Sequence, residues 1–331
     1  MVYSNIIGLG SYSPSQIIKN DALSEIVDTS DEWIRTRTGI KQRRITAGEK
    51  TSQMALKAAK AAIKDAGIEK EEIDLIIFST ITPDFFTPST ASIVQAELGL
   101  IDIPSFDISA GCTGFIYGMQ IADQFIKSKQ CETTLVIGAE ALSKVTNWSD
   151  RNTCVLFGDG AGAAILQSDE REGIISTYTG SQGDLEGYLT LPAIPVRNPF
   201  LKHQENNGHQ SHIYMNGKEI FKFATRIMIR SITRVLDQSN YSINDIDYII
   251  PHQANIRIID YVSQKLKIDK ERFIVNLDRF GNTSAASIPL AMDEAYKDHR
   301  FCPGNKIIMV AFGGGLTWGA ALANWTMQGD K

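Results

Sequence analysis

The sequence predicts an α/β protein made of two similar halves, each built around a parallel sheet. Short apolar runs typical of buried strands alternate with longer patterns of helical spacing. Residues 72–77 and 245–250 also share one pattern, an acid followed by Ile, Asp, either Leu or Tyr, and two Ile. With 331 residues, 43% of them hydrophobic, the chain is long enough to bury a substantial core in both halves.

The elements around these two runs occur in the same order. An amphipathic helix precedes each run, over 54–66 in the first half and over 220–236 in the second. A proline-marked loop and a further helix follow, over 90–98 and 255–266, and a strand then ends at a polar turn flanked by glycine. A single helix-to-strand junction of this kind is common, but four successive elements in matching order favour a duplicated fold.

The region between the halves departs from this pattern. Several prolines interrupt regular structure within residues 180–215, so we expect domains over 1–175 and 176–331. The polar stretch 204–212 is typical of an exposed loop. No cluster of Cys or carboxylate residues accompanies its surrounding histidines, so we expect no metal site there; they are His203, His209 and His212.

The composition narrows the classes of function. A net charge of -5 argues against a general nucleic-acid-binding protein. The start of the chain lacks the basic and apolar regions of a secretory signal, and no apolar run approaches membrane-spanning length. The four cysteines, at positions 112, 131, 154 and 302, form no Cys-x-x-Cys pair. We therefore expect a cytoplasmic protein with free thiols, no bound metal and no membrane partner.

Cys112 is the first candidate catalytic residue. It ends an apolar, strand-like run and starts a helical pattern, so we expect its thiol near the unpaired N–H groups and the positive end of a helix dipole. Both favour the thiolate, and the flanking glycines leave the sulfur open to a substrate. The alternative is that Cys112 fills an apolar helix–strand junction, a common role of free cysteine.

Two further polar residues occupy matching positions in the second half. His252 follows the strand run at 245–250, and ligands gather at the carboxyl ends of strands in open α/β sheets. Asn282 lies in a glycine turn before a helix. Either residue can be structural, His252 as a neutral core histidine and Asn282 as a helix cap. Together with Cys112 they form a candidate nucleophilic constellation.

Consecutive glycines at 313–315 form a fourth candidate segment. They bring bare backbone N–H groups close to a ligand, where these groups can stabilise a developing oxyanion. A tight turn between two strands is the alternative. The segment at 8–13 opens like a dinucleotide-binding fingerprint, but it lacks the last glycine and Pro14 follows it, so we do not expect nucleotide binding there.

Taken together, these segments strongly resemble the β-ketoacyl-acyl carrier protein synthase III family, the initiating condensing enzymes of bacterial type II fatty acid synthesis. The similarity extends nearly end to end. Seven motifs occur in family order, at 28–34, 37–40, 111–114, 157–162, 251–255, 281–284 and 312–315. The resemblance implies the thiolase fold, which is a duplicated αβαβα five-layer sandwich, and a homodimer.

The resemblance also implies a decarboxylative Claisen condensation. Cys112 takes the acyl group of an acyl-CoA primer, and CoA leaves. His252 and Asn282 then donate hydrogen bonds to the thioester carbonyl of malonyl-acyl carrier protein as carbon dioxide departs. The carbanion attacks the acyl-cysteine and gives a β-ketoacyl-acyl carrier protein. The backbone N–H groups of Cys112 and Gly314 form the oxyanion hole, and no cofactor is required.

Binding residues follow from the same resemblance. Those expected to contact CoA are Trp33 at the adenine, Arg37 and Arg151 at the nucleotide and its phosphates, and Gly217, Phe221 and Asn255 along the pantetheine tunnel. Lys218 stands where the family often has asparagine. Because acyl carrier protein is acidic and this chain is also acidic overall, docking requires a local basic patch. We expect the docking residues to be Lys222, Gln253, Arg257 and Lys265.

One departure from the family bears on the primer. Thr87 precedes Pro88 where the family often has a bulky residue that crosses the dimer interface and closes the acyl pocket. A smaller residue there predicts primers longer or more branched than acetyl, although a shift of one residue puts Phe86 at this place. The loop at 197–213 also looks longer than usual.

Two other functions stay open at this point. The first is a thiolase-fold acyltransferase that supplies a starter unit or forms an ester in secondary metabolism, or an enzyme like 3-hydroxy-3-methylglutaryl-CoA synthase. Such relatives keep the cysteine but often lose the His–Asn pair. The second is a non-catalytic homologue that binds a carrier. Retention of Cys112, His252 and Asn282 favours the condensing enzyme.

Overall fold

The computed structural model describes residues 2–195, 199–200 and 211–328. The first sheet consists of β1 (Tyr3–Tyr12), β4 (Leu75–Ser79), β5 (Ser105–Ile108), β6 (Thr133–Glu140) and β7 (Gly160–Asp169). The second consists of β8 (Ile174–Ser181), β11 (Tyr248–Pro251), β12 (Lys306–Gly313) and β13 (Thr317–Asn324). The main helices are α3 (Thr51–Ala66), α4 (Thr90–Leu98), α5 (Gly114–Lys127), α6 (Gly217–Ser239), α7 (Ile256–Leu266) and α9 (Ser287–Lys297).

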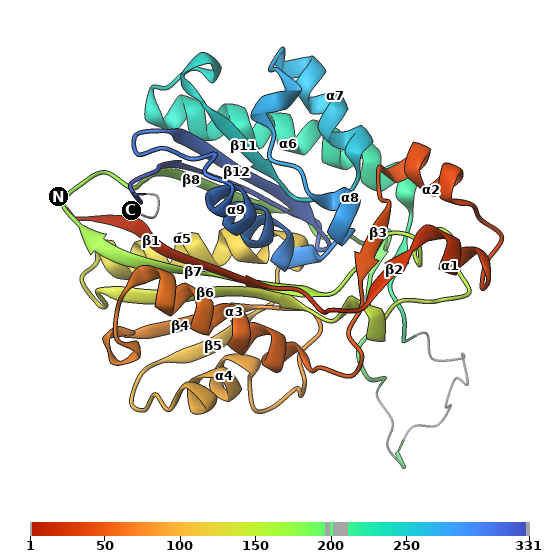
Figure 1. The fold of residues 1–331 in the computed structure, drawn as a ribbon, viewed down its shortest axis with the longest axis horizontal. Coiled ribbons are helices and arrows are strands. Elements are labelled where there is room, and N and C mark those ends of the chain that lie inside the picture. The colour runs from red at the N-terminus through yellow and green to blue at the C-terminus, as the bar shows by residue number, and fades with distance from the viewer. Residues whose placement is uncertain (1, 196–198, 201–210, 329–331) are drawn as a thin grey trace.

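Three layers of helices enclose the two sheets, as Figure 1 shows. α5 and α9 lie between the sheets and contact both of them. α3 and α4 cover the outer face of the first sheet, and α6 and α7 cover the outer face of the second. Buried apolar side chains fill each space between layers, including Phe78 under α3, Phe115 between the sheets and Phe312 under α6. The predicted αβαβα sandwich is confirmed.

The two sheets repeat one topology. The first has the strand order β1-β7-β6-β4-β5, and the second has β8-β13-β12-β11. In the first, β4 is parallel to β6, which is antiparallel to β7. In the second, β11 is parallel to β12, which is antiparallel to β13. The helix preceding β4 therefore corresponds to the helix preceding β11, and the duplication read from the sequence extends to strand order and direction.

The prediction of a strand just before Asn282 is wrong. Phe273 makes a single bridge to Ile249, and the chain then enters a short helix, α8 (Leu277–Phe280). The Gln253 side chain replaces the missing strand pairing. Its Nε2 donates to the carbonyls of Pro251 and Ile274, at 2.7 and 3.1 Å, and its Oε1 accepts from the Asn276 N–H at 3.1 Å. A side-chain amide thus satisfies backbone groups that a strand would have paired.

The glycines at the start of the chain have a packing role. They lie in β1, and a Cβ added to Gly8 or Gly10 would come within 2.5 or 2.3 Å of backbone carbonyl oxygens of α3. The facing residues of α3 are Ala58 and Ala62. Small residues on both sides therefore let a helix and a strand approach closely, which explains a motif that only superficially looks like a nucleotide-binding loop.

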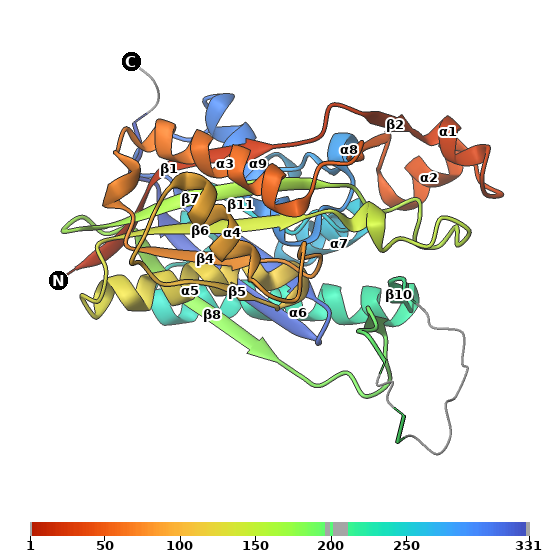
Figure 2. The same cartoon turned by 90° about the horizontal axis from the view of Figure 1, so that it is seen from below.

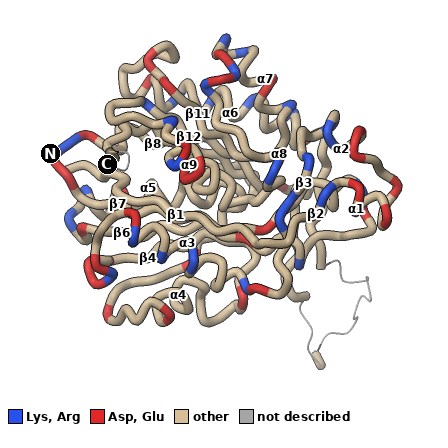
Figure 3. The backbone as a smooth tube through the Cα atoms, in the orientation of Figure 1, with Lys and Arg blue, Asp and Glu red and all other residues tan. Residues whose placement is uncertain are grey.

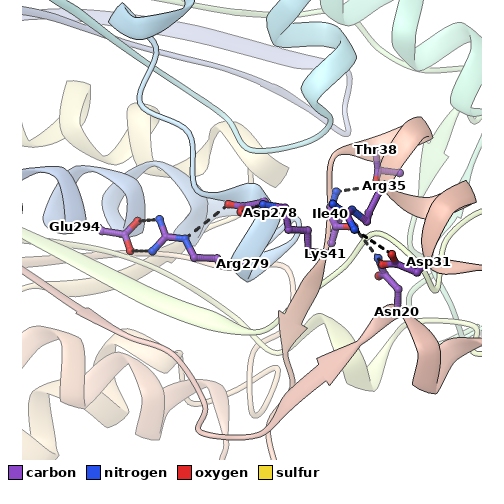
Figure 4. A network of polar contacts seen from close by, with 9 residues as sticks. All are labelled: Asn20, Asp31, Arg35, Thr38, Ile40, Lys41, Asp278, Arg279 and Glu294. Carbon is purple, nitrogen blue, oxygen red and sulfur yellow. Dashed lines mark hydrogen bonds and ion pairs between the residues drawn. The ribbon is translucent and has the colours of Figure 1, made fainter.

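An N-terminal cap gathers at one end of the molecule, as Figures 1 and 2 show. It consists of β2 (Ile17–Lys19), α1 (Asn20–Ser24), α2 (Asp31–Thr38) and β3 (Gln42–Arg44). Within the cap, Asn20 Nδ2 donates to Asp31 Oδ1 and to the Ile40 carbonyl, both at 2.8 Å (Figure 4). Lys41 Nζ binds Asp278 Oδ2 at 3.0 Å, and this contact ties the cap to α8, next to the turn that carries Asn282.

The segment between the halves contains more regular structure than the prolines indicated. β9 (Leu189–Thr190) and β10 (Tyr214–Met215) form an antiparallel pair. β8 begins at Ile174, so the division expected after residue 175 falls within the first strand of the second sheet, and that division stays a prediction. Residues 201–210, with His203, His209 and most of the loop at 197–213, lie outside the described residues. In the described part of the chain, no helix is both long and apolar enough to span a membrane.

Candidate active site

Cys112, His252 and Asn282 line one cavity of about 1150 Å³. They come from three places far apart in the sequence: the turn after β5, the end of β11 and the turn after α8. The cavity is also lined by residues of α2, α6 and α7. The duplicated fold therefore brings together the three residues that the sequence singled out.

The Cys112 turn contacts the glycine hairpin between β12 and β13. Cys112 lies in a 3₁₀ turn, Gly111–Thr113, that leads directly into α5. A Cβ added to Gly313 would lie 2.6 Å from Cys112 N, and one added to Gly111 would lie 3.0 Å from Gly314 N. Gly111 also has a φ of 54°, in the left-handed region that favours glycine. The hairpin turn and the close backbone approach, which the sequence offered as alternatives, occur together.

The surroundings of Cys112 oppose the thiolate that its position at a helix start favours. Burial raises the pKa of its thiol to about 12, although a hydrogen bond with Ser284 acts in the opposite direction. The position at the start of a helix is as predicted, but loss of bulk water outweighs the helix dipole at this depth. Cys112 is therefore a thiol at neutral pH and requires a base before it can attack.

His252 is held as a neutral donor. The side chain is 2% exposed, and burial lowers its pKa to about 3. Its Nδ1 lies 2.7 Å from Ser287 Oγ, which also accepts the Gln253 N–H at 3.4 Å. In the tautomer that carries the ring proton on Nε2, Ser287 Oγ donates to Nδ1 while it accepts from the backbone, and Nε2 is a hydrogen-bond donor.

Asn282 is fixed at both its backbone and its side chain. Its N–H donates to the Leu156 carbonyl, and its carbonyl accepts from the Gly158 N–H, both at 2.9 Å. Its Oδ1 accepts from the Ser284 N–H at 2.9 Å, which leaves the amide nitrogen for the cavity. Gly281, with φ 67° and ψ -158°, makes this turn possible, since an added Cβ would lie 2.8 Å from the Leu156 carbonyl oxygen.

Sequence reasoning missed a buried acid next to these residues. Glu140, the last residue of β6, is 0% exposed, and burial raises its pKa to about 7. Its Oε1 accepts from Ser284 Oγ at 3.1 Å. The only signal in the sequence was an acid closing an otherwise apolar strand run, at the edge where ligands gather. Its link to Ser284 spans 144 positions and could not be read from the chain.

Most of the residues expected to contact CoA also border the cavity. Trp33, Arg37, Gly217, Phe221 and Asn255 all line it, as does Lys218. Arg151 is not among the lining residues. Its guanidinium lies over the Trp33 ring, 4.6 Å from the ring centroid, and donates to the Asp28 carbonyl at 2.9 Å. One face of the indole expected to stack on adenine is thus covered by an arginine expected to bind phosphate.

The expected docking residues divide into two groups. Lys222, Arg257 and Lys265 are exposed on α6 and α7, and Arg257 lies over the Phe221 ring at 5.7 Å from its centroid. The docking role predicted for Gln253 is wrong, because its side chain is 1% exposed and fully engaged in the hydrogen bonds described above. Gln253 therefore has a structural role. Figure 3 shows acidic segments between the basic ones along α7, so the basic patch is local rather than a continuous stripe.

Thr87 does not line the cavity of its own chain. Phe85 and Phe86 do line it, although both are exposed, at 52% and 77%. The role assigned to Thr87 involves the pocket of a second subunit, so it stays a prediction.

Comparison with known proteins agrees with this site. Residues 106–183 match the family model described as 3-Oxoacyl-[acyl-carrier-protein (ACP)] synthase III, and residues 236–325 match the model for its C-terminal part. Beta-ketoacyl-[acyl-carrier-protein] synthase III of Clostridium novyi (strain NT) is 54% identical over 316 residues, covering 96% of this chain and 97% of that protein.

Two solved structures are similar over nearly the whole chain. The 3-oxoacyl-[acyl-carrier-protein] synthase III of Aquifex aeolicus VF5 has a TM-score of 0.90 and 47% identity, covering 97% of this chain and 100% of that one. The priming beta-ketosynthase of the R1128 polyketide biosynthetic pathway has a TM-score of 0.90 and 32% identity, covering 98% and 97%. Near full-length identity above 50% to curated members, together with both family models, shows that the chain belongs to the β-ketoacyl-[acyl-carrier-protein] synthase III family.

Proposed function

We propose that this chain catalyses the decarboxylative condensation of an acyl-CoA primer with malonyl-acyl carrier protein, the reaction that initiates fatty acid synthesis. One observation carries the proposal: a thiol, a neutral imidazole and an amide line a single cavity next to a tight glycine hairpin. The names of the similar proteins agree with it.

In the first half-reaction, Cys112 attacks the thioester carbonyl of the acyl-CoA. The negative oxygen that forms is stabilised by the backbone N–H groups of Cys112 and Gly314, whose segments are in direct contact. Trp33, Arg37 and Arg151 bind the nucleotide, where fixed guanidinium groups suit phosphate oxygens. The pantetheine arm passes Gly217, Phe221 and Asn255, which border the cavity.

In the second half-reaction, malonyl-acyl carrier protein replaces CoA. His252 Nε2 and Asn282 Nδ2 donate to the malonyl thioester carbonyl and stabilise the enolate left when carbon dioxide departs. A neutral imidazole suits this role because it donates a hydrogen bond without transferring a full charge. The carbanion attacks the acyl-cysteine, and the carbon–sulfur bond to Cys112 breaks. Loss of carbon dioxide drives the step, so the reaction requires no metal or redox cofactor.

Several finer points belong to the same proposal. A homodimer fits the exposed Phe86 and Ile101 beside β5, the edge strand of the first sheet. Thr87 then reaches the partner's pocket and admits primers larger than acetyl. Comparable kinetics with acetyl-CoA and hexanoyl-CoA would support this, and strict acetyl preference would contradict it. A cytoplasmic location agrees with four free cysteines.

The competing functions have less support. A starter-unit role in secondary metabolism is represented by the polyketide priming enzyme at 32% identity, whereas curated fatty acid relatives exceed 50%. A non-catalytic homologue would have no need to keep the thiol, imidazole and amide in one cavity.

The Asn282→Ala variant tests the division of roles. Losing one donor to the enolate oxygen is expected to reduce condensation by about 10²–10³-fold, while single-turnover acylation of Cys112 by acetyl-CoA stays near wild type. The Cys112→Ala protein is the matched control, since it should lose acylation and retain malonyl decarboxylation. An equal loss of acylation and condensation in Asn282→Ala, in a protein with an unchanged melting temperature, would contradict the assignment.

A further inference from the structure

Ser284 lies between the nucleophile and the buried acid. Its hydroxyl donates to Glu140 Oε1 at 3.1 Å, and its 3₁₀ turn, Ser284–Ala286, packs directly against the turn that carries Cys112, where Ser284 lowers the pKa of the thiol. The residue adopts a φ of 51°, in the left-handed region that non-glycine residues rarely occupy. Strained backbone of this kind persists where surrounding contacts demand it, and it concentrates at functional sites. The strain here places one hydroxyl between two titratable groups.

Glu140 is held only by uncharged donors. Thr80 and Thr82 donate to its Oε2 at 3.0 and 2.5 Å, and the Ile81 N–H lies 3.1 Å from the same oxygen. Ser284 is the donor to Oε1 that leads back to Cys112. A buried carboxylate held by neutral donors keeps appreciable affinity for a proton, unlike one locked in an ion pair.

We propose that Glu140 is the general base for Cys112 and receives the thiol proton through the hydroxyl of Ser284. The inference rests on the proposed function, because it concerns how the same cysteine becomes a nucleophile. Ser284 acts as a relay, and Glu140 is the group that finally holds the proton.

Two proton transfers accompany the attack of Cys112 on the thioester. The Cys112 proton moves to Ser284 Oγ, the Ser284 hydroxyl proton moves to Glu140 Oε1, and the sulfur lone pair forms a bond to the thioester carbon. When the tetrahedral intermediate collapses, the carbon–sulfur bond to CoA breaks. The proton on Glu140 returns to Ser284, and the Ser284 hydroxyl protonates the leaving CoA thiolate. Glu140 is then a carboxylate again, ready for the next cycle.

His252 cannot take this role. Its Nδ1 is engaged with Ser287 Oγ at 2.7 Å, and its proposed role as a donor to the malonyl carbonyl requires the ring proton on Nε2, so neither ring nitrogen offers a free lone pair to the thiol. Burial also lowers its pKa to about 3, which makes the imidazole a poor base at neutral pH. Glu140, whose pKa burial raises to about 7, is matched to operation near neutrality.

The other charges near Glu140 are few and are engaged. Lys144 Nζ donates to the carbonyls of Thr82 and Pro83, at 2.7 and 2.9 Å. The carboxylates of Asp84, Glu140 and Asp159 all act on the Lys144 charge, and Asp159 is itself bound by Thr46 and Ser143. The pH dependence predicted below is therefore that of Glu140 coupled to Cys112.

The test measures the rate at which iodoacetamide alkylates Cys112 between pH 5 and pH 10. Peptide mass spectrometry follows the Cys112 peptide alone, because the exposed Cys302 would react as well. In the wild-type protein, the rate should rise as Glu140 ionises near pH 7 and then level off. In Glu140→Gln, the rate at pH 8 should fall about 10²-fold, and it should continue to rise with pH without levelling off.

Two further variants keep the test decisive. Ser284→Ala retains Glu140 and the backbone N–H that binds Asn282, yet it should lose the same inflection. Asp159→Asn is the matched control, since it also removes a fully buried carboxylate but has no hydroxyl path to Cys112. Its profile should match wild type. An unchanged inflection near pH 7 in folded Glu140→Gln or Ser284→Ala would overturn the relay. Alkylation uses neither acyl-CoA nor carrier protein, so failure of the proposed function would be detected separately.

Discussion

The contact between the Cys112 turn and the glycine hairpin predicts a large effect from a single methyl group. In Gly313→Ala, the new Cβ would lie 2.6 Å from Cys112 N and 3.3 Å from both Cys112 Cα and Cβ. Ordinary carbon contacts begin near about 3.5 Å, so the two backbone segments must separate by roughly 0.9 Å. The N–H groups of Cys112 and Gly314 would then no longer converge on one oxygen.

A displacement approaching 1 Å at reacting groups costs about 10²-fold in rate, which corresponds to about 2.7 kcal/mol of activation free energy. Single-turnover acylation by acetyl-CoA, followed as the mass of the Cys112 peptide, measures this loss directly. Gly183→Ala is the matched control, because an added Cβ there meets nothing within 4 Å. Acylation by Gly313→Ala within about threefold of wild type, in a normally folded protein, would refute the reasoning.

The remaining predictions concern pH, carrier docking and CoA. Burial lowers the pKa of His252 from 6.5 to about 3, so between these pH values only the unfolded chain binds the proton. The free energy of unfolding therefore decreases as the pH is lowered. At pH 5 this loss amounts to about 2 kcal/mol. Urea unfolding of His252→Gln should therefore show a smaller loss of stability between pH 7.5 and pH 5 than wild type shows. Equal losses in the two proteins would contradict the burial argument. Arg257→Glu should raise KM for malonyl-acyl carrier protein and leave acylation by acetyl-CoA unchanged. The control Lys60→Glu, on the distant α3, should change neither reaction. Equal loss of both reactions in Arg257→Glu would contradict a docking role. Trp33→Ala should raise KM for acyl-CoA but leave acylation by a short N-acetylcysteamine thioester unchanged, and a similar loss with both donors would contradict adenine stacking.

Sequence reasoning located the reactive groups because strand ends and glycine turns have local signatures. Cys112, His252 and Asn282 each follow a recognisable pattern, and all three line the same cavity. The ionisation state of Cys112 could not be predicted from the sequence, because it depends on how far packing removes the thiol from water.

Long-range contacts account for the other errors. Gln253 looked like a surface residue beside His252, but its amide replaces a missing strand pairing. Glu140 gave only a weak local signal, an acid at the end of an apolar strand run, because its role depends on a hydroxyl 144 positions later in the chain. Short-range pattern thus indicates where chemistry occurs, while burial and distant partners decide the protonation of each group.

The central claim is that Cys112 carries the acyl group between an acyl-CoA and malonyl-acyl carrier protein. The most direct measurement is to incubate the purified protein with acetyl-CoA and with longer or branched acyl-CoAs, map the adducts by mass spectrometry, and then add malonyl-acyl carrier protein. We predict acylation confined to Cys112, discharged on addition of the carrier into a β-ketoacyl product with release of carbon dioxide. A Cys112 adduct that yields no new carbon–carbon bond, or no adduct with any donor, would contradict the account.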